Sequence, residues 1–146
     1  MTTRILFVCA GNICRSPTAE AVMKHLVDQA GVADEFEIDS AGTGNWHAGQ
    51  PADERSREAA ARRGLELTSR ARAVSPADFE RFDVIASVDE ENLTRLRRIA
   101  PPGSHAQLRL LSTRDVPDPY YRDDGFDEVL DMIEIACADL LAELQR

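Results

Sequence analysis

The sequence contains no apolar run long enough to cross a bilayer, which takes about 20 consecutive apolar residues in a helix. Its first residues, Met1-Thr2-Thr3-Arg4, lead straight into a strand-like pattern. A secretory signal peptide would place an apolar segment and a cleavage site there. We therefore expect a cytoplasmic protein with no membrane partner.

Cysteine is scarce, because the chain has only three, and no pair of them has the C-x-x-C spacing. An odd number without such a pair indicates neither a disulfide framework nor a zinc finger. We expect the thiols to be reduced, so each is available either as a packing group or as a nucleophile.

Positive charge is in the minority, with 17 Lys and Arg residues against 26 Asp and Glu residues and a formal net charge of −9. Nucleic acids are bound by clustered Lys and Arg, so a nucleic-acid partner is disfavoured. The length of 146 residues and the hydrophobic fraction of 43% suit one globular domain, spanning 1–146.

Strand-like and helix-like segments alternate along the chain. Apolar or alternating stretches predict strands at 4–8, 36–40, 83–88 and 108–111. Helix signals follow them: Ser16 as N-cap with Pro17 at the first helical position and a stop at Gly31, a helix over 53–63 ending at Gly64, a short helix begun by Ser75-Pro76-Ala77-Asp78, and a helix opened by Asp89.

The last predicted helix has the clearest periodicity. Its apolar residues recur at intervals of four and three, and they are Phe126, Leu130, Ile133, Cys137, Leu140 and Leu144. The whole pattern predicts a three-layer α/β fold, in which a four-stranded parallel sheet of flavodoxin-like order 2-1-3-4 has helices on both faces. Ligands of such sheets bind beyond the carboxyl ends of the strands.

One such strand end carries the segment Cys9-Ala10-Gly11-Asn12-Ile13-Cys14-Arg15-Ser16. A thiol attacks phosphorus only as the thiolate. A helix N-terminus with unpaired N–H groups, together with a guanidinium, favours both that thiolate and a bound phosphate dianion. The segment therefore predicts a phosphate pocket with Cys9 as nucleophile and Arg15 as anion clamp. A buried structural cysteine is the alternative interpretation of Cys9.

A thiolate that displaces an alkoxide or phenoxide needs an acid to protonate the leaving oxygen, and the same group can then activate the hydrolytic water. Asp118 is the best candidate in the chain. It lies in Val116-Pro117-Asp118-Pro119-Tyr120-Tyr121, where two prolines stiffen the loop and two aromatic residues supply an apolar wall.

Three further aspartates near Asp118 raise the possibility of a metal site. They are Asp115, Asp123 and Asp124. No ligand-spacing motif accompanies them, so an acidic, solvated loop is the better interpretation. We expect neither a metal nor a cofactor.

Four segments together resemble the low-molecular-weight protein tyrosine phosphatase family, and the resemblance covers nearly the whole chain. The segments are Val8 to Pro17 around the cysteine loop, Asp39-Ser40-Ala41-Gly42-Thr43, Asp89-Glu90-Glu91-Asn92-Leu93 and Asp118-Pro119-Tyr120-Tyr121. The resemblance implies a phosphocysteine intermediate on Cys9, phosphoryl oxygens clamped by Arg15, and Asp118 as general acid and then general base.

The resemblance also assigns supporting roles. It implies that Asn12 and Ser40 brace the loop and that Ser16 steadies the thiolate as it leaves. The remaining substrate- and phosphate-binding positions are Ala10, Gly11, Ile13, Cys14, Trp46 and Tyr120. Flat apolar walls at the pocket entrance would suit a phosphoaryl ring. Taken alone, a residue such as Trp46 would be expected in partial core burial.

One segment departs from the family pattern. Many relatives carry a His-x-Ala-Arg segment whose histidine joins the hydrogen-bond network around the loop asparagine, and the aligned stretch here is Ser69-Arg70-Ala71-Arg72. Ser69 can neither reach as far nor carry charge, which leaves loop rigidity and the pH behaviour of the network open. The chain's own histidines, His25, His47 and His105, are scattered and are interpreted as non-catalytic.

The second loop thiol, Cys14, has two interpretations. The resemblance suggests a reversible disulfide with Cys9 that protects the nucleophile from irreversible oxidation, whereas the residue type favours a packed loop cysteine. Cys137 lies on the apolar stripe of the last helix and is expected in the core.

Other functions on the same scaffold remain as alternatives. An arsenate reductase would need a pair of resolving cysteines, and no cysteine lies between Arg15 and Ala136. A sugar-phosphotransferase component would have to preserve its phosphocysteine, and a non-catalytic phosphotyrosine-binding module would need the anion loop alone. The joint presence of Cys9, Arg15 and Asp118 favours hydrolysis of aryl phosphates. The resemblance implies tyrosine-phosphorylated proteins as substrates, and we expect the protein to be a monomer.

Overall fold

The computed structural model describes residues 2–122 and 124–146. Its centre is a four-stranded parallel sheet of order β2-β1-β3-β4. The strands are β1 Thr3–Cys9, β2 Phe36–Gly42, β3 Val84–Ser87 and β4 Gln107–Leu110. The predicted sheet and its order 2-1-3-4 are confirmed.

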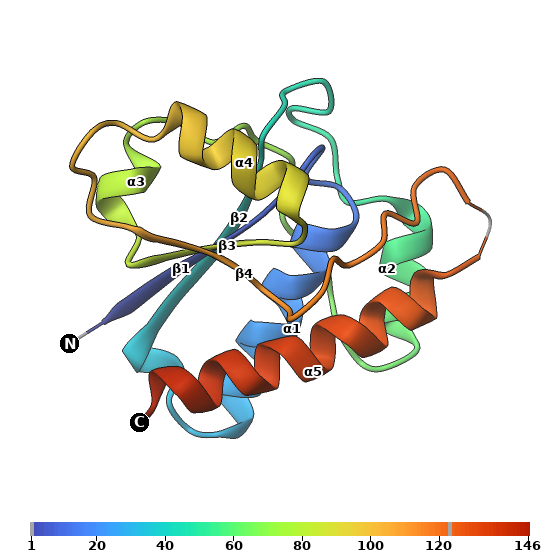
Figure 1. The fold of residues 1–146 in the computed structure, drawn as a ribbon. Helices are drawn as coiled ribbons and strands as arrows, with labels where there is room; N and C mark the ends of the chain where they lie inside the picture. Colours follow the sequence, from blue (N-terminus) through green and yellow to red (C-terminus); the bar gives the residue numbers. More distant parts are fainter. Residues whose placement is uncertain (1, 123) are drawn as a thin grey trace.

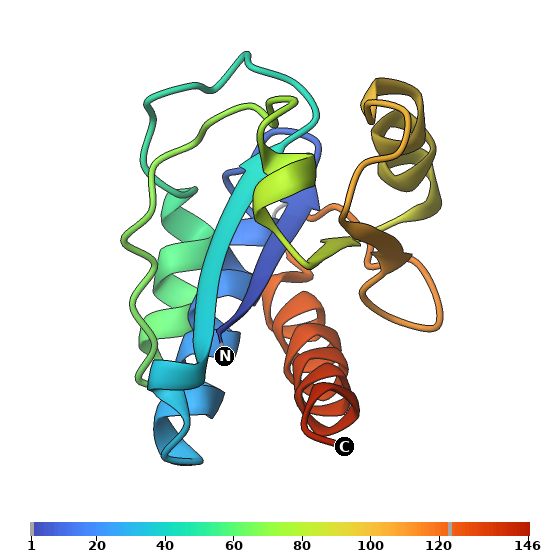
Figure 2. The same cartoon turned by 90° about the vertical axis from the view of Figure 1, so that its left-hand side faces the viewer.

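Helices cover both faces of the sheet, as predicted (Figures 1 and 2). The helices α1, α2 and α5 pack on one face, and α3 and α4 pack on the other. Their bounds are α1 Arg15–Gln29, α2 Glu54–Ala61, α3 Asp78–Arg81, α4 Glu90–Ile99 and α5 Phe126–Leu144, with a 3₁₀ turn η1 at Ala33–Glu35. Within the described residues, none of the helices has the length and apolar character needed to span a bilayer.

Alternate side chains of β1 divide between two hydrophobic clusters. Ile5, Phe7 and Cys9 belong to the cluster under α1 and α5, whereas Leu6 and Val8 belong to the cluster under α3 and α4. This alternation follows from the two-residue period of a strand, and both faces are apolar because parallel sheets are covered on both sides. The central strand is therefore held rigidly, and its carboxyl end is Cys9.

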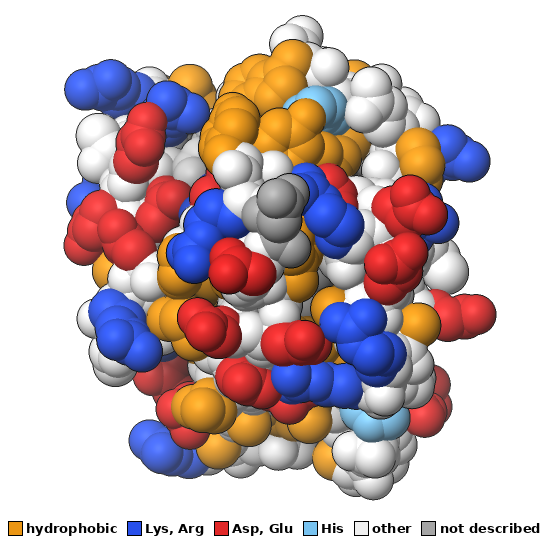
Figure 3. All heavy atoms as spheres, turned by 90° about the vertical axis from the view of Figure 1, so that its right-hand side faces the viewer, with side chains coloured by type: hydrophobic (Ala, Val, Ile, Leu, Met, Phe, Trp, Pro, Cys, Tyr) orange, Lys and Arg blue, Asp and Glu red, His pale blue; other side chains and the backbone are white. Residues whose placement is uncertain are grey.

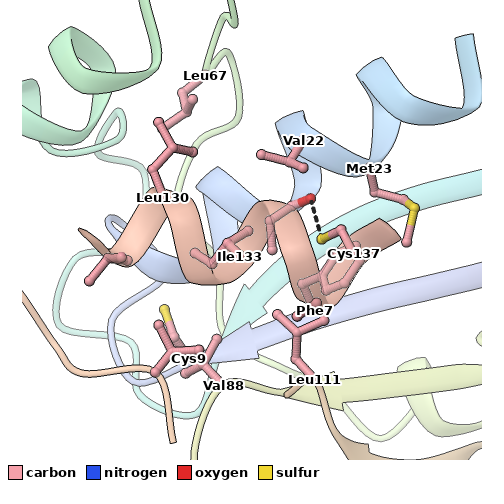
Figure 4. Packing of buried hydrophobic residues seen from close by; sticks show 14 of the residues in the cluster. Phe7, Cys9, Val22, Met23, Leu67, Val88, Leu111, Leu130, Ile133 and Cys137 are labelled. Atoms are coloured by element: carbon pink, nitrogen blue, oxygen red, sulfur yellow. Dashed lines mark hydrogen bonds between the residues drawn. The ribbon is translucent and has the colours of Figure 1, made fainter. Parts of the chain in front are cut away.

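The apolar stripe of α5 packs against β1 and α1 as its periodicity predicts (Figure 4). Ile133 and Cys137 have no exposed surface. The Cys137 thiol lies 3.8 Å from the carbonyl oxygen of Ala19 in α1, and donates to it. The expected core location of Cys137 is thus confirmed.

The first helix begins two residues earlier than predicted, and Ser16 does not cap it. α1 starts at Arg15, with Cys14 in the N-cap position and no capping side chain. Ser16 Oγ lies 2.9 Å from Cys9 Sγ instead, so its hydroxyl serves the loop. Pro17 lies in the first turn, where a missing N–H costs no intrahelical bond.

The other helix signals act where they were predicted, with one shift. The carboxylates of Asp53 and Asp89 cap α2 and α4, and Gly31 and Gly64 follow their helices with φ of 73° and 77°. The predicted start at Ser75 marks the turn before α3, because the Ser75 N–H donates to the Asp78 carboxylate and the helix begins at Asp78 itself.

Candidate active site

The loop from Cys9 to Arg15, referred to here as the phosphate loop, joins the carboxyl end of β1 to the N-terminus of α1. Cys9 at its start is 3% exposed. The backbone N–H of Asn12 points at Cys9 Sγ from 3.3 Å, and Ser16 Oγ lies 2.9 Å from it. Hydrogen-bond donors aimed at a sulfur favour its ionised form. Two polar groups of the loop and the first helical turn thus converge on the Cys9 sulfur.

Asn12 fixes the shape of the phosphate loop. Its φ is 57°, in the left-handed region that few residues other than glycine adopt. Its side-chain amide donates to Ser16 Oγ at 2.8 Å and to Ser40 Oγ at 3.0 Å, and its carbonyl oxygen accepts from the Arg72 N–H at 3.0 Å. Three separate segments thus hold this one strained residue, and the loop is preformed.

Arg15 is a buried cation held in one orientation. Its side chain is 4% exposed, and Nη1 donates to Asp89 at 2.7 Å and to the Val116 carbonyl at 3.0 Å. Burial opposes its charge, but the negative charge on Cys9, the hydrogen bond to Asp89 and the charge of Asp118 together raise the pKa of Arg15 above its ordinary value. The Arg15 guanidinium therefore stays charged.

Asp89 orients this guanidinium, a role that the sequence interpretation missed. One carboxylate oxygen accepts from Arg15, and the other accepts from the backbone and side-chain N–H groups of Asn92, each at 2.8 Å. Burial raises the pKa of Asp89, but hydrogen bonds from Asn92 and Arg15 outweigh it and hold that pKa below its usual range. A signal was available, because Asp89 follows the carboxyl end of β3, the predicted neighbour of β1.

Asp118 faces Arg15 from the loop between β4 and α5. Its Oδ2 lies 3.5 Å from Arg15 Nη2, and its Oδ1 accepts from the Tyr120 N–H at 3.0 Å. The side chain is 35% exposed. The carboxyl group therefore lies at the mouth of the site, where a proton can reach a leaving group and water can enter.

These groups surround one pocket. Its lining includes nine of the predicted residues, namely Cys9, Ala10, Gly11, Ile13, Cys14, Arg15, Trp46, Asp118 and Tyr120, and two that were not predicted, His47 and Tyr121. Asn12, Ser16 and Ser40 do not line it. Asn12 belongs to the phosphate loop itself, and its side chain donates to the hydroxyls of Ser16 and Ser40.

Aromatic rings form the rim of the pocket. His47 lies between Trp46 and Tyr120, with ring centroids 6.2 Å and 5.6 Å away, and Tyr121 meets Tyr120 edge-on at 4.9 Å. Figure 3 shows hydrophobic side chains gathered around a histidine on this face. Trp46 is 57% exposed, so the core burial expected from its residue type alone is wrong.

Two glycines, Gly44 and Gly11, allow the aromatic rings of the rim to lie close to the backbone. A Cβ on Gly44 would be 1.4 Å from the Trp46 ring, and a Cβ on Gly11 would be 2.8 Å from the His47 ring. His47 is therefore a wall of the pocket, although its spacing in the sequence gave no reason to place it there. The signal was its position next to Trp46 in a glycine-containing loop.

The remaining thiols differ from Cys9. Burial, and then the charge of Asp53, raise the pKa of Cys14 to about 12, and burial raises the pKa of Cys137 further. All three cysteines are free in the structure. Cys14 is packed in the loop and is 5% exposed. A disulfide between Cys14 and Cys9 stays a prediction.

The acidic residues near Asp118 have partners of their own. Asp115 accepts from the Glu90 N–H at 3.0 Å, and Asp124 pairs with Arg122 at 3.3 Å. Asp123 lies outside the described residues. Over 2–122 and 124–146, no three His, Cys, Asp or Glu side chains are grouped to hold a metal ion.

A parallel α/β sheet, a cysteine–arginine loop at the end of its central strand and a carboxyl group facing that loop are the features of a phosphoryl-transfer protein. The model of the low molecular weight phosphotyrosine protein phosphatase family matches residues 4–146. The chain belongs to this family, and the resemblance seen in its motifs is confirmed.

Individual relatives agree with this assignment. The chain is 45% identical over 157 aligned positions to a low molecular weight protein-tyrosine-phosphatase of Streptomyces coelicolor, covering 100% of the chain and 96% of the relative. A crystal structure of a protein tyrosine phosphatase from Entamoeba histolytica is 39% identical, with a TM-score of 0.94 and coverage of 99% and 97%. The structure of a Drosophila arginine phosphatase is 30% identical, with a TM-score of 0.93 and coverage of 97% and 98%.

Proposed function

We propose that the protein hydrolyses phosphotyrosine in proteins, and small aryl phosphates, through a phosphocysteine intermediate on Cys9. One observation carries the assignment of residues: Cys9, Arg15 and Asp118 line the same pocket, with Asp118 Oδ2 3.5 Å from Arg15 Nη2. Family membership supports the reaction, and this convergence supports the role of each group.

In the first step, backbone N–H groups of the phosphate loop and the Arg15 guanidinium bind the phosphoryl oxygens. The Cys9 thiolate attacks phosphorus, and the bond from phosphorus to the phenolic oxygen breaks. Asp118 gives its proton to that oxygen, so tyrosine leaves as a neutral phenol rather than as an anion.

In the second step, the Asp118 carboxylate takes a proton from a water molecule, whose oxygen attacks phosphorus. The bond between sulfur and phosphorus breaks, which releases inorganic phosphate and restores the Cys9 thiolate. Ser16 Oγ, 2.9 Å from the sulfur, donates a hydrogen bond to the departing thiolate. Both steps use the same donors, so the site needs no rearrangement between them.

The rim supports an aryl phosphate as substrate. Trp46 and Tyr120 offer flat apolar surfaces against which a phenyl ring can pack. Since one relative of known structure is an arginine phosphatase, phosphoarginine is the informative competitor. We expect a higher kcat/KM for a phosphotyrosine peptide than for a matched phosphoarginine peptide.

The arrangement disfavours the alternative functions. An arsenate reductase must pass oxidation to a second, reactive thiol, but burial and the charge of Asp53 raise the pKa of Cys14 to about 12, and Cys137 has no exposed surface. A module that only binds phosphotyrosine has no use for a nucleophile and an acid in the same pocket. A single domain, a monomeric state and a cytoplasmic location stay predictions.

The pH dependence of kcat/KM tests the proposal. We expect the rate to fall on the alkaline side, where Asp118 has lost the proton that it must donate. Asp118→Asn should lower kcat/KM for phenyl phosphate by about 10²- to 10⁴-fold, the usual contribution of an acid catalyst, and should abolish the alkaline limb.

Two further variants complete this test. Asp115→Asn changes a carboxylate of the same loop that accepts from the Glu90 N–H, and it should leave the profile unchanged. Cys9→Ser should abolish turnover. Retained turnover in Cys9→Ser would refute the nucleophile, and an unchanged alkaline limb in Asp118→Asn would remove Asp118 from the acid role.

A further inference from the structure

Beyond Asp115 and Val116, the segment that carries the general acid has few hydrogen bonds to the rest of the described protein. Residues 115–122, referred to here as the acid loop, form no helix or strand. Within the described part of the chain, the hydrogen bonds that reach the backbone of residues 117–122 from outside come from one side chain, Arg55 of α2. Figure 1 shows the acid loop, in orange, passing beside α2.

Arg55 binds two carbonyl groups of the acid loop. Nη2 donates to the Tyr120 carbonyl at 2.9 Å, and Nη1 donates to the Arg122 carbonyl at 2.7 Å. The guanidinium carbon also lies 4.7 Å from the centre of the Phe126 ring and 5.9 Å from that of Tyr120. Arg55 thus binds the acid loop at two backbone carbonyls and packs against the ring of Tyr120.

Arg55 is itself held by α2. Its Nε and Nη2 donate to the two oxygens of Asp53 at 3.1 and 3.0 Å, a two-pronged ion pair. Burial opposes the charge of Asp53, but hydrogen bonds from the Arg55 side chain and backbone lower its pKa. A bidentate pair fixes the plane of the guanidinium, which a single ammonium contact cannot do.

The same end of α2 is joined to the phosphate loop. The backbone N–H of Asp53 donates to the Ile13 carbonyl at 2.7 Å. Asp53 and Arg55 therefore connect the loop that holds the nucleophile with the loop that holds the acid. On the acid side the connection is short, because Asp118 Oδ1 accepts from the Tyr120 N–H and the Tyr120 carbonyl accepts from Arg55.

We propose that Arg55 is a positioning residue for the general acid: by fixing the Tyr120 and Arg122 carbonyls it keeps the Asp118 carboxyl group at proton-transfer distance from the oxygen that leaves phosphorus. The inference rests on the proposed function of Asp118. A displacement of about 1 Å in a reacting group can cost about 100-fold in rate, so the arginine acts without touching substrate.

Leaving-group dependence tests this role. Phenyl phosphate needs its oxygen protonated, whereas 2,4-dinitrophenyl phosphate releases a stable anion. Because kcat/KM compares free enzyme and substrate with the first committed transition state, Arg55→Met should lower it about 10- to 100-fold for phenyl phosphate and less than about 3-fold for the dinitrophenyl ester. The alkaline limb of the phenyl phosphate profile should weaken in parallel.

A double-mutant comparison separates positioning from general damage. Where Asp118→Asn has already removed the proton donor, adding Arg55→Met should lower kcat/KM for phenyl phosphate by less than about 3-fold, because the two changes act on one interaction. Arg62→Met is the matched control, since Arg62 also lies at α2 but pairs with Asp127 of α5. Arg62→Met should leave kcat/KM unchanged for both phenyl phosphate and 2,4-dinitrophenyl phosphate.

Arg55→Lys repeats the leaving-group test with the positive charge retained. It replaces Arg55→Met in that test if the methionine variant does not fold. An ammonium cannot bind two carbonyls and a carboxylate in one plane, so the same selective loss is expected. Competitive inhibition by orthophosphate should stay within about 2-fold of wild type if the phosphate loop is intact.

The outcomes separate the two proposals. Three results would overturn the role of Arg55. The first is an equal loss of kcat/KM on both esters in Arg55→Met and Arg55→Lys, and the second is wild-type kcat/KM in both variants. The third is a fully additive loss when Arg55→Met is combined with Asp118→Asn. If Asp118→Asn alone shows no leaving-group selectivity, the acid assignment fails instead.

Discussion

Asp89 and Asp83 lie beyond opposite ends of β3. Comparing Asp89→Asn with Asp83→Asn therefore measures how much the Asp89 carboxylate contributes to the orientation of Arg15. Asp89→Asn keeps the size of the side chain and its ability to cap α4 but removes the charge beside a guanidinium that is 4% exposed. Breaking a buried ion pair costs about 3–5 kcal/mol when the other charge is left alone. Arg15 retains Asp118 and the Val116 carbonyl, so we expect a loss of about 1.5–3 kcal/mol, the worth of a hydrogen bond to a charged group.

The pH dependence of this loss follows from the pKa of Asp89. Its pKa is lower in the folded protein than in the unfolded chain, where an aspartate titrates near about 3.9. The stabilisation is therefore fully present above that value and disappears as pH falls through the lower folded value. The difference in unfolding free energy between wild type and Asp89→Asn should be constant from pH about 7 to 5 and should narrow below about 4.

Urea denaturation across this pH range measures the difference, and orthophosphate inhibition reports the binding site. A misoriented Arg15 should weaken phosphate about 10-fold, equivalent to about 1.4 kcal/mol. Asp83→Asn is the control: a hydrogen bond from His105 lowers the pKa of Asp83, but its side chain is 37% exposed and lies away from the site. Wild-type stability at pH 7 together with unchanged phosphate inhibition in Asp89→Asn would refute the reasoning.

Two further predictions concern the thiols and the rim. Iodoacetamide at pH 7 should alkylate Cys9 and spare Cys14, because burial and the charge of Asp53 raise the pKa of Cys14 to about 12. Peptide mass mapping measures the labelling of each cysteine. Equal labelling of Cys9 and Cys14 would contradict the prediction. Gly44→Ala places a methyl group 1.4 Å from the Trp46 ring, so the ring must move. KM for a phosphotyrosine peptide should rise about 2- to 10-fold with kcat retained, the equivalent of about 0.5–1.5 kcal/mol of aromatic contact. The emission of Trp46, the only tryptophan in the chain, should shift, and unchanged KM and emission would contradict the prediction.

The sequence predicts the sheet well because its strands are buried on both faces and its helices carry caps and stops. The error at Ser16 shows the limit of local signals. A serine before a proline is a normal helix start, but here the Ser16 hydroxyl is used by Cys9 and Asn12. Hydrogen bonds to Cys9 and Asn12 thus replace the helix cap that the local pattern predicted for the Ser16 side chain.

Among the site residues that were missed, those that follow a strand end could be foreseen, and those that depend on the conformation of a loop could not. Asp89 was within reach, because the sheet order alone places the end of β3 beside the phosphate loop. Arg55 was not, since it binds a carbonyl 65 residues away in a loop without secondary structure. His47 depends likewise on how its loop folds back over Gly11. Such contacts are set by loop conformation, for which the sequence has no periodicity.

The absence of the family histidine at Ser69 can be assessed from the partners of Asn12. Both amide protons of Asn12 are bound, by Ser16 Oγ and Ser40 Oγ, and its carbonyl oxygen is bound by the Arg72 backbone. A backbone donor cannot be lost by substitution of a side chain. The left-handed Asn12 is therefore held without any contribution from position 69.

The hydroxyl of Ser40 extends this network in a single direction. It has one proton, which it donates to Glu20 at 2.6 Å, so towards Asn12 it can only accept. Glu20 is 5% exposed, and its other oxygen accepts from Lys24 at 2.6 Å. The chain of donors from Asn12 through Ser40 thus ends on a carboxylate whose charge is matched. No imidazole takes part in these hydrogen bonds of Asn12, Ser40 and Glu20.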